Sequence, residues 1–101
     1  AFFAAGIDEI LCVSVNDAFV MNAWGSSLQV GDAVKMIGDG NGEFAKALGL
    51  SQDLSARGMG HRSQRYAMLV EDGVVRHLAV EAPGKFEVSD AQSMLKWVQQ
   101  L

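Results

Sequence analysis

The clearest pattern of apolar and polar residues runs from Arg65 to Glu81 and predicts a β-hairpin. Two runs rich in Val, Leu and Met flank the triplet Glu71-Asp72-Gly73. Asp-Gly supplies the positive φ angles that a tight hairpin turn needs. The first run is almost wholly apolar, which is typical of a strand covered on both faces. The second run alternates, as in a strand nearer a sheet edge, with one side made of Val75, His77, Ala79 and Glu81.

The pattern before the hairpin predicts a strand, a helix and a second strand in succession. The first strand is Ile10–Val15, a short apolar run dense in β-branched residues that we interpret as buried. Asn16-Asp17 offers an N-cap for a helix over about residues 18–24, and Gly25 closes that helix. The second strand is Val34–Ile37. Two strands joined by a helix favour a right-handed parallel crossover.

The middle of the chain predicts a loop, a short helix and a longer loop. The loop Gly38–Gly42 precedes a helix over Glu43–Leu48, with Gly49 as its stop. A glycine-rich loop before a helix can hold a phosphate. Its spacing here matches neither the P-loop nor the dinucleotide fingerprint, so a plain turn and helix cap is favoured. Leu50–Gln64 shows little periodicity and predicts a long ordered loop, a kind that is usually functional or interfacial.

The two ends of the chain each predict helix. Residues 1–5 look helical, with Gly6 as a C-terminal stop. Pro83-Gly84 makes a turn after the hairpin. Ser89 then caps a last helix, and Gln92 three residues later completes a capping-box pattern. One face of this helix is apolar and must pack on the sheet: Ala91, Met94, Leu95, Val98 and Leu101.

Length and charge limit the classes of protein that fit. The 101 residues predict one domain, 1–101, and half of them are apolar, so a core can form. The net charge of −4 and the absence of a basic run speak against nucleic-acid binding. No apolar run is long enough to span a bilayer. A single cysteine excludes an internal disulfide and favours a reducing compartment, so we expect a cytoplasmic protein.

Few residues offer chemistry. Cys12 lies in the middle of an apolar strand, where a small core residue is the favoured interpretation over a nucleophile. His61 and His77 have no metal-ligand spacing, so we expect neither a metal nor a cofactor. Arg65 stands at the start of the most apolar strand. Its pattern leaves two alternatives open, a surface cap of the strand or a guanidinium fork aimed at an anion.

Four segments resemble the second half of atypical, Prx5-like peroxiredoxins. They are Leu11–Met21, Asp39–Phe44, Gly58–Tyr66 and Val80–Ser89, and they cover nearly the whole chain in the right order. The resemblance implies an α/β protein with a partial thioredoxin-like fold, in which a mixed sheet with a β-hairpin is flanked by helices. It also implies a thioredoxin- or glutaredoxin-type reductant for the intact parent protein.

This family reduces hydrogen peroxide and alkyl hydroperoxides at a peroxidatic cysteine. That cysteine lies on an early strand–helix turn, in a motif with proline and threonine. The chain has no threonine, its only proline is Pro83, and Cys12 matches a later, non-peroxidatic position. The resemblance therefore begins at the end of the active-site helix, and the chain is either processed or a piece of something longer. We expect the chain to be inactive as a peroxidase by itself.

One family site residue carries over by resemblance. Arg65 matches the arginine that the family aims at the peroxidatic sulfur, where its charge favours thiolate and its N–H groups hold the peroxide oxygens. We expect its guanidinium to be partly buried and to bind a small anion. Phe86 and the loop Leu50–Gln64 resemble, more loosely, the active-site rim and the dimer surface.

Two hypotheses for function follow. The chain is the C-terminal part of a thiol peroxidase, or it is a non-catalytic thioredoxin-fold module for assembly or binding. The family's central strand, which would lie between Ile10–Val15 and Tyr66–Glu71, is missing from this sequence. Either those two strands pair directly, or a second copy supplies an edge partner. The second alternative is favoured, so we expect a homodimer or larger assembly that involves strand edges.

Overall fold

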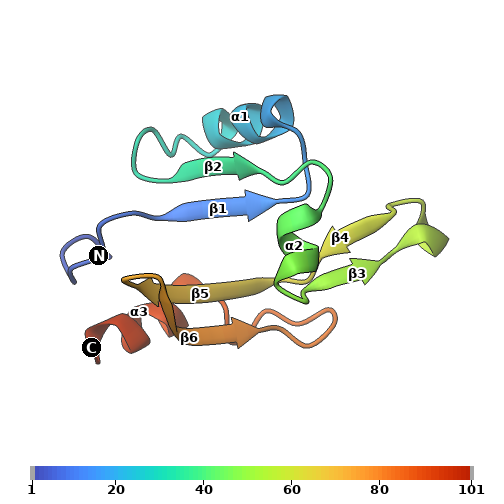
Figure 1. Ribbon diagram of the computed structural model, residues 1–101. Coiled ribbons are helices and arrows are strands. Elements are labelled where there is room, and N and C mark those ends of the chain that lie inside the picture. Colours follow the sequence, from blue (N-terminus) through green and yellow to red (C-terminus); the bar gives the residue numbers. More distant parts are fainter. Residues whose placement is uncertain (1, 101) are drawn as a thin grey trace. The chain divides into compact units, whose positions relative to one another are not determined.

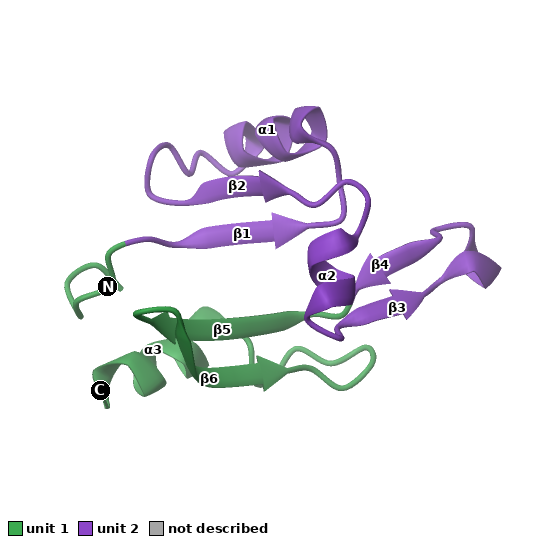
Figure 2. Ribbon diagram, viewed as in Figure 1, with its two compact units in different colours: residues 1–8, 64–101 green, residues 9–63 purple. Residues whose placement is uncertain are grey.

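The computed structural model describes residues 2–100 and divides into two compact units (Figures 1 and 2). Residues 9–63 form one, called here the crossover unit, and residues 1–8 with 64–101 form the other, the hairpin unit. The elements in chain order are β1 (Leu11–Ser14), α1 (Ala18–Ser27), β2 (Lys35–Gly38), α2 (Glu43–Ala47), β3 (Ser51–Asp53), the 3-10 helix η1 (Ser55–Arg57), β4 (His61–Ser63), β5 (Tyr66–Glu71), β6 (Val74–Val80) and α3 (Ala91–Gln99). The single domain that the length predicts stays a prediction.

The crossover unit contains the predicted strand–helix–strand succession. β1 and β2 pair in parallel, from Leu11 opposite Lys35 to Ser14 opposite Gly38, and α1 connects them. Asp17 is the N-cap of α1, and its carboxylate accepts a hydrogen bond of 2.8 Å from the Val20 N–H. The parallel pairing confirms the prediction, although Leu11 is exposed and β1 is not the fully buried strand that its apolar sequence indicates.

The end of α1 differs from the prediction, because Gly25 does not close the helix. α1 continues to Ser27, and Gly25 is buried within it. A Cβ atom on Gly25 would lie 2.8 Å from Cγ of Met36, so the missing side chain allows α1 to approach β2 closely. The left-handed conformation that ends many helices occurs instead at Gln29, whose φ is 56°.

The long loop predicted over residues 50–64 is wrong for most of its length. β3 and β4 form a small antiparallel hairpin around η1, with Ser51 opposite Ser63 and Asp53 opposite His61. Strands of three residues are too short to show a periodic pattern in the sequence, which explains the error. The short helix before this hairpin is confirmed as α2.

The hairpin unit confirms the β-hairpin around Asp72 and Gly73. Both residues have positive φ angles, 54° and 77°, as a tight turn requires. β5 and β6 pair antiparallel, with a register shift between Leu69 and Val70. The core joins this sheet to α3 through Leu69, Ala79, Met94 and Val98. The other face of β5 is not covered in the way that its apolar run predicts, since Val70 is 49% exposed.

Two end predictions need correction. Residues 2–6 form hydrogen-bonded turns rather than a helix, and Ala1 and Leu101 lie outside the described residues. The N-cap of α3 is Asp90 rather than Ser89, because the Asp90 carboxylate accepts the Ser93 N–H at 3.2 Å. Of the apolar helix face, Met94 and Val98 are buried, whereas Ala91 is exposed.

Each of the three sheets in the described residues has two strands, so every strand has a single strand neighbour. β1 hydrogen-bonds to β2 and β5 to β6, and within residues 2–100 neither β1 nor β5 has a second strand neighbour. β1 and β5 belong to different units, so the two expected alternatives, direct pairing of these strands and an edge partner from a second copy, stay predictions. Over the same residues, no helix has the length and apolar character needed to cross a membrane.

Candidate functional site

The structure brings together the two site residues that the sequence singles out. Arg65 precedes β5, and its guanidinium carbon lies 4.8 Å from the centroid of the Phe86 ring. Phe86 belongs to the segment between β6 and α3. The backbone joins the two regions as well, since the Glu81 N–H donates to the Arg65 carbonyl at 2.9 Å. All of these residues belong to the hairpin unit.

Arg65 is an exposed residue, and Phe86, which lies over one face of its guanidinium, is 60% exposed. The expected partial burial of the guanidinium stays a prediction. A cation–π contact at an exposed site contributes only about 0.5–1 kcal/mol. The ion pairs within residues 2–100 join Lys35 to Glu9 and Arg76 to Glu71, and neither of them uses Arg65. The guanidinium face that Phe86 leaves open can therefore receive an anion or a peroxide oxygen.

Glu81 is a residue of this site that the sequence analysis did not single out. It follows β6, is only 6% exposed, and its carboxylate accepts hydrogen bonds from a short run of backbone. The donors are the N–H groups of Glu87 (2.9 and 3.0 Å), Val88 (2.9 Å) and Ser89 (2.7 Å), together with the Ser89 hydroxyl (2.6 Å). A signal was present in the sequence, because Glu81 falls on the same side of its strand as the buried Ala79.

These hydrogen bonds keep Glu81 ionised. Burial raises the pKa of its carboxyl, but the bonds from Ser89, Glu87 and Val88 outweigh burial and lower the pKa to about 2. At neutral pH the residue is therefore a fixed negative charge surrounded by N–H and O–H donors. The Glu81 carboxylate binds backbone N–H groups and the Ser89 hydroxyl, and among the described residues it forms no ion pair with Arg65.

Cys12 lacks the surroundings of a reactive thiol. It lies half-buried in β1, and burial raises the pKa of its thiol above the usual value. A nucleophilic cysteine needs the opposite shift, from a cationic neighbour or a helix N-terminus. This environment supports the interpretation of Cys12 as a packing residue.

The other candidate sites from the sequence show no binding or catalytic geometry in the described residues. The Asp39 carboxylate accepts from the N–H groups of Phe44 (3.1 Å) and Ala45 (3.0 Å), so the start of α2 is already capped from within, as a plain turn requires. Residues 50–63 belong to the crossover unit. Among the described residues, no group of three or more His, Cys, Asp or Glu side chains could hold a metal ion.

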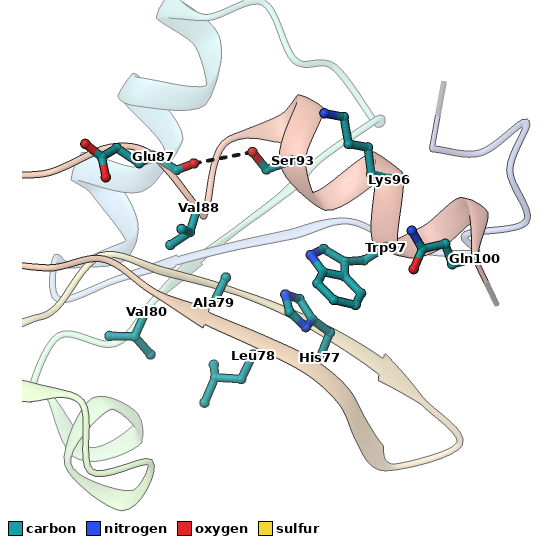
Figure 3. A pocket seen from close by; sticks show the side chains of 10 residues that line it. All are labelled: His77, Leu78, Ala79, Val80, Glu87, Val88, Ser93, Lys96, Trp97 and Gln100. Atoms are coloured by element: carbon teal, nitrogen blue, oxygen red, sulfur yellow. Dashed lines mark hydrogen bonds between the residues drawn. The ribbon is translucent and has the colours of Figure 1, made fainter.

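An open groove of about 550 Å³ lies between β6 and α3 in the hairpin unit (Figure 3). The His77 and Trp97 rings stack there, with centroids 3.9 Å apart and planes 20° from parallel. The Ser93 hydroxyl donates to the Glu87 carbonyl at 3.5 Å along one wall. Neither Arg65 nor Phe86 lines this groove, so it is separate from the site that the sequence indicates.

Comparisons of the sequence and of the structure with known proteins find relatives of one kind. The redoxin family pattern matches residues 2–95. The chain is 55% identical over 96 residues to chloroplastic peroxiredoxin-2E-2 of Oryza sativa subsp. japonica. It is 68% identical to a Burkholderia cenocepacia crystal structure provisionally described as a thioredoxin reductase, with a TM-score of 0.91, and 51% identical to reduced Prx3 of Vibrio vulnificus in complex with H2O2, with a TM-score of 0.90.

The chain spans about half the length of these relatives. It is matched over 92% of its own length but over only 43% of the rice protein. The two solved structures cover 93% and 95% of this chain, which in turn covers 56% and 60% of theirs. A partial thioredoxin-like α/β fold agrees with these shares and with the mixed strand pairing. The chain therefore belongs to the redoxin family, and within it to the peroxiredoxins.

Proposed function

We propose that this chain is the arginine-bearing part of a thiol peroxidase that reduces hydrogen peroxide and alkyl hydroperoxides. The observation that carries the proposal is the placement of Arg65, an exposed residue whose guanidinium lies against Phe86 and outside the ion pairs of the described residues. In this proposal the peroxidatic cysteine lies outside the 101 residues, because Cys12 is half-buried and its pKa is raised. A thioredoxin- or glutaredoxin-type protein supplies the electrons.

The chemistry explains why an accessible arginine is needed. A cysteine thiolate attacks one peroxide oxygen, a sulfur–oxygen bond forms, and the oxygen–oxygen bond breaks. The departing oxygen carries negative charge until it takes a proton and leaves as water or an alcohol. A guanidinium beside the reacting atoms favours thiolate over thiol and stabilises the charge on the departing oxygen. The related Vibrio vulnificus structure contains H2O2, which supports peroxide as the substrate class.

A chimera tests the proposal without knowledge of the parent gene. The matching segment of Vibrio vulnificus Prx3 is replaced by this chain, and peroxide reduction is followed with a thioredoxin-coupled assay. We expect activity in the chimera and a loss of about 10²–10³-fold in kcat/KM for Arg65→Ala, which is typical when one charge-stabilising donor is removed. Arg76→Ala is the matched control, since Arg76 lies on β6 in an exposed ion pair with Glu71 and should not affect turnover. Equal activity of both variants would contradict the assignment of Arg65.

A second function, a non-catalytic binding or assembly module, is favoured by the environment of the only cysteine. A chain whose single thiol has a raised pKa lacks a nucleophile for peroxide. The chimera assay with Arg65→Ala separates this function from the first one. The same coupled assay, run on the 101-residue chain beside Cys12→Ser, tests whether Cys12 can act as a nucleophile. We expect no catalytic turnover from either protein. Turnover that disappears in Cys12→Ser would overturn the assignment of Cys12 as a packing residue.

The assembly state follows from the strand edges. β1 and β5 each have one strand neighbour within residues 2–100, so each offers a row of backbone N–H and C=O groups. Unpaired backbone groups that are kept from water cost about 1–3 kcal/mol each, which favours an added strand. We infer that copies of this chain form a homodimer or larger assembly through strand edges. Sedimentation at micromolar concentration tests this, and a cooperatively melting monomer would contradict it.

A further inference from the structure

We propose that Glu81 is a positioning residue for the Arg65 site, and that its carboxylate keeps the Phe86 ring on the Arg65 guanidinium by holding residues 87–89. The inference rests on the proposed function only for the role of Arg65 in peroxide reduction. The arrangement of Glu81, Phe86 and Arg65 is a separate claim about this chain.

Glu81 is hydrogen-bonded to Arg65 and to the residue that follows Phe86. Its main-chain N–H donates to the Arg65 carbonyl at 2.9 Å, which aligns the end of β6 with the start of β5. Its side-chain carboxylate accepts the Glu87 N–H at 2.9 and 3.0 Å, one residue after Phe86. A single residue therefore binds the main chain of Arg65 and the main chain next to Phe86.

The site requires a carboxylate, because each described hydrogen bond to the Glu81 side chain comes from a donor. Oε2 accepts from the N–H groups of Glu87, Val88 and Ser89 and from the Ser89 hydroxyl, and Oε1 accepts from Glu87. An ionised carboxylate offers only lone pairs, which matches this set of donors. A glutamine would keep the oxygen at Oε2 but would place an N–H donor against the Glu87 N–H.

The contact with Arg65 holds the Phe86 ring only weakly, because Phe86 is 60% exposed and the contact is a cation–π contact at the surface. The preceding segment contributes the Pro83-Gly84 turn, in which the Lys85 N–H donates to the Ala82 carbonyl at 2.9 Å. An exposed contact of this kind is too weak to order a loop, whereas a buried carboxylate with several backbone donors can do so.

The test is the NMR resonance of the Arg65 guanidinium in the 101-residue chain, because the ring current of Phe86 shifts it. Phe86→Ala gives the reference value without the ring. In Glu81→Ala we expect the resonance to move fully to that reference value. Ser89→Ala removes the 2.6 Å bond but keeps the backbone donors, so a partial shift is expected. Met94→Ala weakens the core of the same unit, and it should leave the resonance in place below its melting temperature.

Two results would overturn the proposal. One is an unchanged Arg65 resonance in Glu81→Ala, or in Glu81→Gln if the alanine variant does not fold. The other is an equal shift in Met94→Ala, which would show that general loosening moves the ring. The chimera assay separates this inference from the proposed function. If Arg65→Ala retains activity while the ring still depends on Glu81, the function fails and the positioning claim stands.

Discussion

Gly38 allows the end of β2 to contact the turn that leads into α1, and its replacement offers a sharp test of the crossover unit. A Cβ atom at this position would lie 2.8 Å from the Asn16 carbonyl oxygen, 3.1 Å from the Asp17 carbonyl carbon and 3.2 Å from the Ala18 nitrogen. All three are backbone atoms. The neighbouring Asp39 N–H donates to the Ser14 carbonyl at 2.8 Å, which holds the two segments together. The clash in Gly38→Ala therefore cannot be relieved by a side-chain rotation.

The magnitude follows from two opposing effects. Forcing an extra carbon into a packed site costs about 1–3 kcal/mol. Replacing glycine by alanine recovers about 0.4–1 kcal/mol by restricting the unfolded chain. From the central values, about 2 and about 0.7 kcal/mol, we predict that Gly38→Ala lowers the free energy of unfolding by roughly 1.3 kcal/mol. For a domain of this size the melting temperature falls by about 4–8 °C per kcal/mol, so the decrease is roughly 5–10 °C.

Gly40→Ala is the matched control. A Cβ atom there would lie 3.8 Å from the same Asn16 oxygen, which is ordinary contact, and we expect no loss of stability. Urea denaturation followed by circular dichroism compares the wild type with the two variants. Equal midpoints for Gly38→Ala and Gly40→Ala would refute the reasoning, since they would show that the turn before α1 moves freely away from β2.

Three further predictions concern the thiol, the buried carboxylate and the core. At pH 7.5 iodoacetamide should alkylate the Cys12 thiol more slowly than it alkylates the thiol of glutathione, because burial raises the pKa of Cys12. Equal alkylation rates for the two thiols would contradict this. The pKa of Glu81 falls on folding from 4.5 to about 2, so its stabilising contribution is complete above pH 4.5 and is lost as the pH falls towards 2. The difference in melting temperature between the wild type and Glu81→Gln should shrink as the pH falls from 4.5 towards 2. A difference that stays constant would contradict the lowered pKa of Glu81. Met94→Ala should lower the free energy of unfolding by about 2–5 kcal/mol in urea denaturation, whereas Lys96→Ala, at an exposed position of α3, should not.

Local chemistry was sufficient to predict most of the secondary structure. The turn at Asp72 and Gly73 was recognisable because few other residue pairs tolerate positive φ angles at both positions. The parallel pair around α1 was predictable because a strand, a helix and a strand have one common arrangement. The mixed partial fold followed from the resemblance, since four matching segments lie in family order.

The errors at helix ends have a common physical cause. Gly25 looked like a helix stop, and Ser89 looked like a helix cap. In the structure Gly25 is needed for close packing against Met36, and the Ser89 hydroxyl binds the Glu81 carboxylate. A glycine can end a helix or allow close packing, and a serine can cap a helix or donate to a carboxylate. Which of these roles the residue has depends on its neighbours in the folded structure.

The sequence by itself determined the hairpin, the crossover and, through family resemblance, the importance of Arg65. Only the tertiary structure decided that Arg65 is exposed, that the Phe86 ring lies over it and that Glu81 binds the backbone that follows Phe86. The physical reason is distance along the chain. Periodicity and turn chemistry report on residues a few positions apart, whereas this site joins residues up to 21 positions apart, from 65 to 86. Apart from the Ser89 hydroxyl, its donors are backbone N–H groups, which every residue except proline carries and which therefore leave no mark in the sequence.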